Sequence, residues 1–489
     1  MKEEISKKEK WCYASSSIGR DAAGTLVSLF FITFIQFTCG FTPKQFQVIS
    51  FIIIICRVWD AINDPLMSLI ITNTKSKYGK YKPWILIGAI ANSFFLVSLF
   101  VSPGLKGWNY VVYLSVCYLL YGMTFTMNDV SYWSIIPHLA RSKDTRDNLM
   151  AIVSIFASIG QFITATIISL ATGNMVLTYR LFAIAAAISF VICQIVVLIY
   201  VKEVKEEEKQ NTVSLKEMLK IIFHNDQLLV MVALTFLYSL GSVIIMGFGT
   251  NFFYFKFGYK GIYVTLFIII FAVATLLAQI IFGKLIKKYT RKFLFTITSF
   301  IMIGGYFIFF VLANLPLRLF DGFSYILLVL LGLTGFIIFS SQSIHYLLIL
   351  IMLTNTIEYG EWKSGRRYEA ISFSLRPFVV KLSSSIQQGI LTFILIVSGL
   401  YSLSQEIASL EIQKSMGLIE ESDLAQQANY ILSSASPIQI FILTLGMCII
   451  PLVLYIINYV LFKRNYKIDE SMFEKIRSEL NIIKENKSL

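Results

Sequence analysis

Long apolar segments recur along the whole chain and limit it to an all-helical fold that spans a membrane. A run of about 20 apolar residues can cross roughly 30 Å of hydrocarbon as a helix. Because the hydrocarbon offers no water to backbone polar groups, such a segment must satisfy them internally, as a helix does. The sequence predicts about twelve such segments. They are residues 14–38, 46–72, 83–102, 109–138, 148–173, 178–201, 227–256, 261–287, 292–314, 323–354, 371–400 and 436–461.

The composition indicates an integral membrane protein and argues against nucleic acid as a partner. Of the 489 residues, 56% are hydrophobic, and the mean hydropathy is +0.71. Soluble domains contain about 45–50% apolar residues. The formal charge of +13 comes from basic residues in alternate connections between apolar segments, without a basic stripe interleaved with aromatic residues. We therefore expect a lipid bilayer around the chain.

The basic connections predict the orientation of the chain. The positive-inside rule places Lys-rich and Arg-rich connections in the cytoplasm, so both termini are expected on the cytoplasmic side of the cytoplasmic membrane. The clusters follow the second, fourth, eighth and tenth segments: Lys75, Lys77, Lys80 and Lys82; Arg141, Lys143 and Arg146; Lys287, Lys288, Arg291 and Lys292; Lys363, Arg366 and Arg367.

A charged linker over residues 202–224 divides the chain into two halves of about six segments each. Matching basic connections in the two halves are typical of a duplicated transporter fold. We expect an N-terminal bundle over residues 1–201, a C-terminal bundle over residues 225–465 and a cytoplasmic tail over residues 466–489. The acidic connection over residues 402–434 is expected to be a solvated extracellular loop.

Two carboxylates, Asp60 and Asp64, close the second apolar segment. A charge in the middle of a membrane helix costs on the order of 3 kcal/mol and usually marks an ion or proton pathway. The two residues share a helical face, flanked by Asn63 and Arg57. Two ionised carboxylates so close together repel each other, which favours an intervening Na⁺, Li⁺ or H⁺. The alternative is structural: Asp60 pairs with an arginine to orient helices, and Asp64 caps the next loop.

A second polar group combines aromatic and charged side chains. Thr126, Asp129 and Trp133 share one face of the fourth segment. A carboxylate can bind sugar hydroxyls while an indole packs on the C–H face of a pyranose, although aromatic stripes also face lipid or core. In the first segment, Arg20 and Asp21 are adjacent and point about 100° apart on a helix, so we expect each to bind another partner rather than its neighbour.

The eleventh segment contributes two buried cations, Arg376 and Lys381, which need anionic partners. If Lys381 reaches between Asp60 and Asp129, it can report cation occupancy at one site to a sugar at the other. The alternative is a charge-balancing pair between the halves.

Other chemistries lack support in the sequence. No Cys pair has CxxC spacing, no HExxH motif occurs and no glycine-rich run has the form of a nucleotide-binding phosphate loop. We therefore expect no enzymatic activity, no cofactor and no ATP-driven transport.

Six motifs carry a resemblance over nearly the whole chain: Gly19–Asp21, Arg57–Pro65, Tyr78–Trp84, Gly122–Trp133, Glu358–Glu361 and Val379–Lys381. Through them the sequence resembles the glycoside-pentoside-hexuronide:cation symporters of the major facilitator superfamily, the family that includes melibiose permease. The resemblance implies twelve helices in two six-helix bundles and alternating access. It implies a site for Na⁺, Li⁺ or H⁺ at four residues: Asp60, Asn63, Asp64 and Thr126.

The resemblance also implies a sugar site at Asp21, Asp129 and Trp133, with Arg20 in place of a lysine and Lys381 bridging the two sites. A cytoplasmic gate is expected at three further residues: Glu358, Glu361 and Arg367.

Three positions depart from the family pattern. Ser154 stands where an arginine contacts sugar, Arg376–Pro377 replaces a Gln-Thr pair, and Asn355 replaces an aspartate at the gate. We hypothesise that Arg376 binds a sugar hydroxyl or a substrate carboxylate, which leaves hexuronides and acidic glycosides open as substrates.

The sequence thus predicts a monomeric, cation-coupled symporter of a sugar or glycoside. Two alternatives remain: a transporter of an amphiphilic, lipid-like substrate and a non-transporting membrane sensor. Trp133 beside Asp129 favours a sugar, and a sensor would not need Asp60, Asp64 and Lys381 inside the membrane.

Overall fold

The computed structural model describes residues 5–72, 74, 76–101, 103–139, 143–170, 175–201, 225–316, 322–364 and 369–488. Arg367 lies outside the described residues, and so does the side chain of Arg376, although its backbone belongs to a described helix.

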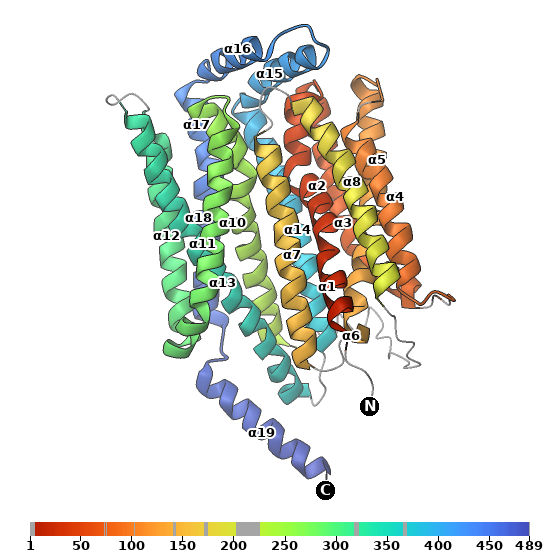
Figure 1. Cartoon of the computed structure of the whole chain (residues 1–489). Helices are drawn as coiled ribbons and strands as arrows, with labels where there is room; N and C mark the ends of the chain where they lie inside the picture. The colour runs from red at the N-terminus through yellow and green to blue at the C-terminus, as the bar shows by residue number, and fades with distance from the viewer. Residues whose placement is uncertain are drawn as a thin grey trace. The chain divides into compact units, whose positions relative to one another are not determined.

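The described part of the chain contains helices and no strand (Figure 1). The helices before the linker are α1 (Lys7–Ser15), α2 (Ser17–Thr38), α3 (Pro43–Thr72), α4 (Lys82–Phe100), α5 (Gly107–Ser134), α6 (Ile136–Leu139), α7 (Lys143–Ser169) and α8 (Met175–Tyr200). Those after it are α10 (Asp226–Phe257), α11 (Gly261–Lys288), α12 (Arg291–Asn314), α13 (Phe323–Ser364), α14 (Glu369–Val397), α15 (Leu400–Ser415), α16 (Glu421–Ser433), α17 (Pro437–Thr444), the π-helical turn η1 (Leu445–Ile449), α18 (Ile450–Asn465) and α19 (Glu470–Ser488).

Twelve helical segments among the described residues are long and apolar enough to cross a membrane. Each overlaps one of the segments expected from hydropathy, so the prediction of an all-helical, multi-pass membrane protein is confirmed. Several limits differ, and the largest difference is that α13 continues to Ser364 instead of ending near residue 354. Because residues 355–364 contain no proline, the helix can extend beyond its apolar part, and Glu358 and Glu361 lie on it.

The acidic connection over residues 402–434 is not the solvated loop that its composition suggested. It forms α15 and α16, which run across the direction of the long helices α2 and α8 (Figure 1). Leu424, Ala428 and Leu432 recur every four residues and are buried, which gives α16 an apolar face. The prediction of a loop was wrong because it relied on the acidic composition and overlooked this helical periodicity.

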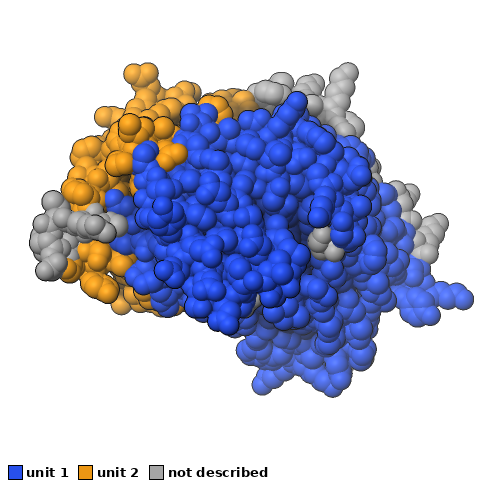
Figure 2. Space-filling view, turned by 90° about the horizontal axis from the view of Figure 1, so that it is seen from above, with its two compact units in different colours: residues 1–209, 253–265, 395–436 blue, residues 210–252, 266–394, 437–489 orange. Residues whose placement is uncertain are grey.

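The chain forms two compact units, shown in different colours in Figure 2. The first unit comprises residues 1–209, 253–265 and 395–436, and the second comprises residues 210–252, 266–394 and 437–489. Two segments that follow the linker in sequence therefore belong to the first unit. The predicted domain limits stay a prediction.

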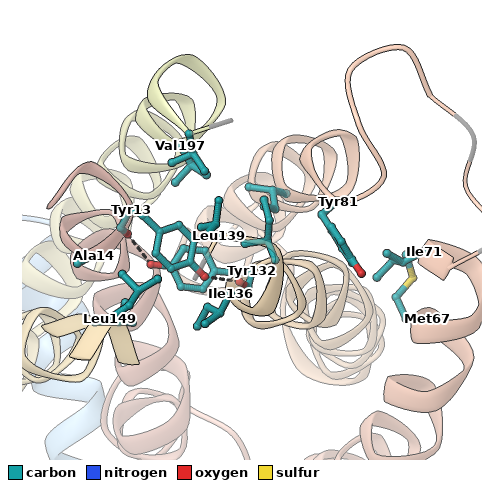
Figure 3. Packing of buried hydrophobic residues seen from close by; sticks show 14 residues of the cluster. Tyr13, Ala14, Met67, Ile71, Tyr81, Tyr132, Ile136, Leu139, Leu149 and Val197 are labelled. Carbon is teal, nitrogen blue, oxygen red and sulfur yellow. Dashed lines mark hydrogen bonds between the residues drawn. The ribbon is translucent and has the colours of Figure 1, made fainter. Parts of the chain in front are cut away.

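A stacked pair of tyrosines fixes α1 to α5 in the first unit (Figure 3). The rings of Tyr13 and Tyr132 are parallel, with centroids 4.5 Å apart. Each hydroxyl donates a hydrogen bond to the backbone carbonyl of the other residue, and Ser16 donates to the Tyr132 hydroxyl at 3.1 Å. Both rings are fully buried with satisfied hydroxyls, and the Tyr132 ring contacts Arg20 on α2.

Candidate functional site

Arg20 on α2 is the centre of a buried charge cluster. Its side chain is 3% exposed, and Nη2 and Nε donate to Oδ2 of Asp21 at 2.7 and 3.1 Å. Nη1 lies 3.4 Å from Oδ1 of Asp129 on α5. The expectation that Arg20 and Asp21 do not pair was therefore wrong, because the long arginine side chain folds back on its neighbour. The same guanidinium also reaches Asp129, so one cation binds two carboxylates.

Aromatic rings on α5 enclose this cluster. The Arg20 guanidinium carbon lies 4.3 Å from the ring centroid of Tyr132 and 5.0 Å from that of Trp133. The Trp133 indole Nε1 donates to Oδ1 of Asp129 at 3.1 Å. The Asp129 side chain nevertheless remains 34% exposed and that of Asp21 17% exposed. A ligand can therefore reach both carboxylates beside an indole, a combination that suits hydroxyl groups on an apolar ring.

Gln161 on α7 is a member of this cluster that sequence reasoning missed. Its Nε2 donates to Oδ1 of Asp21 at 3.3 Å, and its side chain is exposed. Ser154, two turns earlier, donates only to the carbonyl of Met150 in its own helix. The neutral serine side chain therefore supplies no positive charge at the position where the family pattern has an arginine. The sequence pattern that could have indicated Gln161 is the spacing of three polar residues at i, i+4 and i+7 in an apolar helix: Ser154, Ser158 and Gln161.

Replacement of Gln161 tests its role at the carboxylate. We expect Gln161→Ala to weaken sugar binding by about tenfold, the effect of one hydrogen bond to a charged group. Ser154→Ala is the matched control on the same helix and should change the sugar Kd less than about twofold. Titration of both purified variants with sugar measures the difference, and equal Kd values would remove Gln161 from the site.

A second polar group lies between α3 and α5. Asp60, Asn63 and Thr126 are buried, and Thr126 donates from Oγ1 to Oδ1 of Asp64 at 3.0 Å. Asp60 faces Gly122, one turn before Thr126 on α5. Asp60 and Asp64, four residues apart on α3, thus contact Gly122 and Thr126, four residues apart on α5. The structure brings together the oxygen-bearing residues that the sequence singled out here.

The donors of this group suit a hard monovalent cation or a proton. They offer two carboxylates, a hydroxyl and the amide of Asn63, whose Nδ2 is buried without a hydrogen-bond partner. Among the described residues, no group of three His, Cys, Asp or Glu side chains is arranged to bind a metal. Two carboxylates supply the negative charge of this group. Oxygen ligands match alkali cations better than they match soft metals.

Arg57 lies one turn before Asp60 and interacts electrostatically with it. Its guanidinium carbon is 5.9 Å from the ring centroid of Tyr118 on α5. The structural alternative, in which Asp60 pairs with an arginine to orient helices, therefore has a partner in place. A measurement of cation binding distinguishes a cation site from a purely structural pair of Asp60 and Arg57.

Gly122 allows Asp60 to approach α5. A Cβ at this position would overlap Oδ1 of Asp60 and lie 3.1 Å from its Cγ. We expect Gly122→Ala to displace the carboxylate and to weaken cation binding by about tenfold or more, since the end of the Asp60 side chain must move away from α5 to make room for the methyl group. Gly304→Ala is the control, because a Cβ there meets nothing within 4 Å. Cation titration followed by Trp fluorescence measures the effect, and equal affinities for both variants would contradict it.

The remaining predicted residues lie in the second unit. Lys381 is half-buried on α14, and its predicted reach to Asp60 and Asp129 stays a prediction. Near Glu358 and Glu361, Asp226 of α10 binds α13 in two ways. It accepts from the Tyr359 hydroxyl at 3.0 Å and pairs with Lys363 at 2.8 Å. The described neighbours of the predicted gate residues thus attach α13 to α10.

Comparison with known proteins identifies the family. The model of the MFS/sugar transport protein family matches residues 12–470. A lactose permease of Lactobacillus delbrueckii subsp. bulgaricus is 28% identical over 79% of this chain and 63% of its own length. A putative glycoside/cation symporter of Escherichia coli, YagG, is 22% identical over 88% of this chain and 86% of its own length. The chain thus spans less than two thirds of the lactose permease it matches.

Solved structures agree on the fold. The crystal structure of a D-xylose-proton symporter superimposes with a TM-score of 0.59 at 11% identity, covering 88% of this chain and 98% of that one. At this identity the likeness concerns the arrangement of helices alone. Together with the family match, it shows that the chain belongs to the MFS/sugar transport family, and the resemblance to glycoside-pentoside-hexuronide:cation symporters of the major facilitator superfamily is confirmed.

Proposed function

We propose that the protein is a secondary active transporter that carries a sugar or glycoside together with Na⁺, Li⁺ or H⁺ by alternating access. The observation that carries this proposal is the position of both polar groups within about two turns of α5. Thr126 binds Asp64, and Asp129 and Trp133, three and seven residues later, bind each other beside Arg20. A rigid helix therefore links a cation site to a sugar site.

The charges suggest how coupling works. Without a cation, Asp60 and Asp64 repel each other, which disfavours their approach to α5. A bound cation or proton removes this repulsion and fixes Thr126 through its hydrogen bond to Asp64. The turn that follows on α5 then presents Asp129 and Trp133 in one geometry, so that sugar hydroxyls meet a preformed site. Each ligand therefore favours binding of the other.

The cluster leaves Oδ1 of Asp21 able to accept a further hydrogen bond beside that of Gln161. Arg20 saturates Oδ2 of Asp21, while Oδ1 has only the longer bond from the exposed Gln161. We infer that a sugar hydroxyl binds Oδ1 of Asp21 and the exposed face of Asp129, while the ring packs on Trp133. This charged, aromatic site favours a polyol over the apolar tail of a lipid-like substrate.

Further elements of the proposal concern the second unit. Lys381 couples the two sites, Arg376 contacts a hydroxyl or carboxylate of the substrate, and Glu358, Glu361 and Arg367 form a cytoplasmic gate. The protein works in the cytoplasmic membrane with both termini in the cytoplasm. These roles follow from the family pattern and the distribution of basic residues.

Uptake into proteoliposomes tests the proposal. Radiolabelled α- and β-galactosides, glucosides, xylosides and glucuronides are offered under an imposed Na⁺, Li⁺ or proton gradient. We expect one sugar class to accumulate above its external concentration, and only with one of the gradients. Absence of accumulation for every sugar, with folded protein present, would contradict the proposal and favour a lipid-like substrate or a sensor.

A further inference from the structure

The two sides of the proposed sugar site come from α2 and α5, which both belong to the first unit. Arg20 and Asp21 lie on α2, and Asp129 and Trp133 lie on α5. Neither helix is the main packing partner of the other, because α2 packs chiefly against α7 and α8, and α5 packs chiefly against α3 and α4. The geometry of the site therefore depends on what holds α2 and α5 in register.

Glycines let neighbouring helices approach α2 and α5 closely beside the site. A Cβ on Gly19, which precedes Arg20, would lie 2.7 Å from the carbonyl oxygen of Ser189 on α8. A Cβ on Gly88 of α4 would lie 2.6 Å from the backbone nitrogen of Asn128 on α5. Because only a glycine fits at such contacts, α8 holds α2 backbone to backbone, and α4 holds α5 in the same way.

The helices α4 and α8 also pack against each other. Ser93 of α4 donates a hydrogen bond to the Ala187 carbonyl of α8 at 3.0 Å. We call α4 and α8 the scaffold pair. Since one member holds α2 and the other holds α5, the scaffold pair sets the position of the two helices relative to each other.

Gln194 of α8 is the side chain through which the scaffold pair reaches both helices of the site. It is fully buried. Its Nε2 donates to the Ser16 carbonyl at 3.2 Å, and its Oε1 accepts from Nδ2 of Asn128 at 3.4 Å. Ser16 separates α1 from α2, and Asn128 directly precedes Asp129. A buried amide is costly in an apolar membrane helix, and here each end of it bonds to a different helix.

Both ends of this bridge continue to the proposed sugar site. Oγ of Ser16 donates to the Tyr132 hydroxyl at 3.1 Å, and the guanidinium carbon of Arg20 lies 4.3 Å from the centroid of the Tyr132 ring. Nδ2 of Asn128 also donates to the Ile85 carbonyl of α4 at 2.8 Å, which fixes the turn of α5 that carries the carboxylate. Gln194 thus connects the surroundings of the cation to those of the carboxylate.

The contact most sensitive to a shift between α2 and α5 is that of Arg20 with Asp129. The guanidinium binds Asp21 of its own helix at 2.7 Å, whereas its Nη1 lies 3.4 Å from Oδ1 of Asp129. A movement of α2 along α5 leaves the first contact intact and lengthens the second. The pairing of the two sides of the site therefore depends on the bridge between the helices.

We propose that Gln194 is a positioning residue of the sugar site, whose two hydrogen bonds hold Arg20 of α2 in register with Asp129 of α5. It acts through Ser16 and Asn128. This inference rests on the proposed function, because it takes the cluster around Arg20 as the place where the sugar binds.

The sugar and cation affinities of Gln194→Leu test this role. Leucine is also apolar and of similar size, but it neither donates nor accepts a hydrogen bond. We expect the sugar Kd to rise by about tenfold, the effect of lost interhelical hydrogen bonds, and the cation Kd without sugar to change less than about twofold. The proposed cation site lies between α3 and α5 and does not involve α2. Ser93→Ala, which removes one bond within the scaffold pair, is the control and should change neither Kd.

Ser16→Ala is a second variant on the same path. It keeps the carbonyl that Gln194 binds but removes the hydroxyl that reaches Tyr132, so we expect the sugar Kd to rise by about threefold. If Gln194→Leu does not fold, this variant decides. An unchanged sugar Kd would overturn the proposal. An equal rise of the sugar Kd and the cation Kd would also overturn it, because a general loosening of the unit would then explain the effect.

A measurement without sugar distinguishes failure of this inference from failure of the proposed function. Trp133 is kept as the only tryptophan, and its quenching by acrylamide reports how well Arg20, 5.0 Å from its ring centroid, covers the indole. We expect quenching about twofold stronger in Gln194→Leu and unchanged in Ser93→Ala. Stronger quenching in a protein that binds no sugar would support the positioning role and contradict the proposed function. Unchanged quenching, with thermal stability retained, would overturn the positioning role whether or not sugar binds.

Discussion

Replacement of Asp60 by asparagine is expected to abolish cation-driven accumulation of sugar. The carboxylate is buried against Gly122 and shares a face of α3 with Asp64. An amide of the same size keeps the packing but removes the negative charge, which lowers cation affinity by about a hundredfold, or about 3 kcal/mol. Uptake into proteoliposomes under the effective gradient measures the loss.

Two observations separate this effect from misfolding. Asp423→Asn, on the exposed surface of α16, removes one carboxylate elsewhere and should leave uptake unchanged. The Asp60→Asn protein should still exchange labelled for unlabelled sugar across the membrane, since exchange needs no cation gradient. Gradient-driven accumulation at the wild-type level in Asp60→Asn would show that Asp60 only orients helices through Arg57.

The second large effect concerns Arg20, because both carboxylates of the proposed sugar site bind it. Arg20→Gln leaves Asp21 and Asp129 facing each other without their shared cation. Removal of one partner from a buried charge cluster is strongly destabilising, so the carboxylates must take up protons or move apart. We expect sugar affinity to fall by about a hundredfold or more, as measured by equilibrium binding to purified protein.

Arg20→Lys is the matched variant. It keeps the charge but loses the forked geometry that reaches Asp21 and Asp129 together. Because the family pattern has a lysine at this position, we expect Arg20→Lys to retain binding within about tenfold of wild type. Equal losses in the two variants would indicate that the fork, and not the charge, supports the site. Wild-type affinity in Arg20→Gln would exclude the cluster as the sugar site.

Hydropathy predicted the membrane helices, and helical spacing predicted the face of α3 that carries Asp60 and Asp64. Both predictions succeed because they depend only on the sequence of a single helix. The family motif implied that Thr126 and Asp64 belong to one cation site, whereas the hydrogen bond between them comes from the structure. Gln161 was missed since its contact with Asp21 depends on how α7 packs against α2, which one helix alone does not specify.

The burial of Glu411 is a second feature that the sequence alone did not predict. In the sequence it is one of several acidic residues in a connection, and acidity predicted a solvated loop. Its burial depends on Tyr259 and on the N-terminus of α8, more than 150 residues away along the chain. Only tertiary structure brings these donors together.

The central claim is that about two turns of α5 link the proposed cation site to the proposed sugar site, and reciprocal binding tests it most directly. The sugar Kd is measured at a series of cation concentrations, and the cation Kd at a series of sugar concentrations, on the same purified protein. Thermodynamic linkage requires each ligand to tighten the other by the same factor, for which we expect about tenfold. A sugar that binds with one Kd at every concentration of Na⁺, Li⁺ and H⁺ would contradict the account.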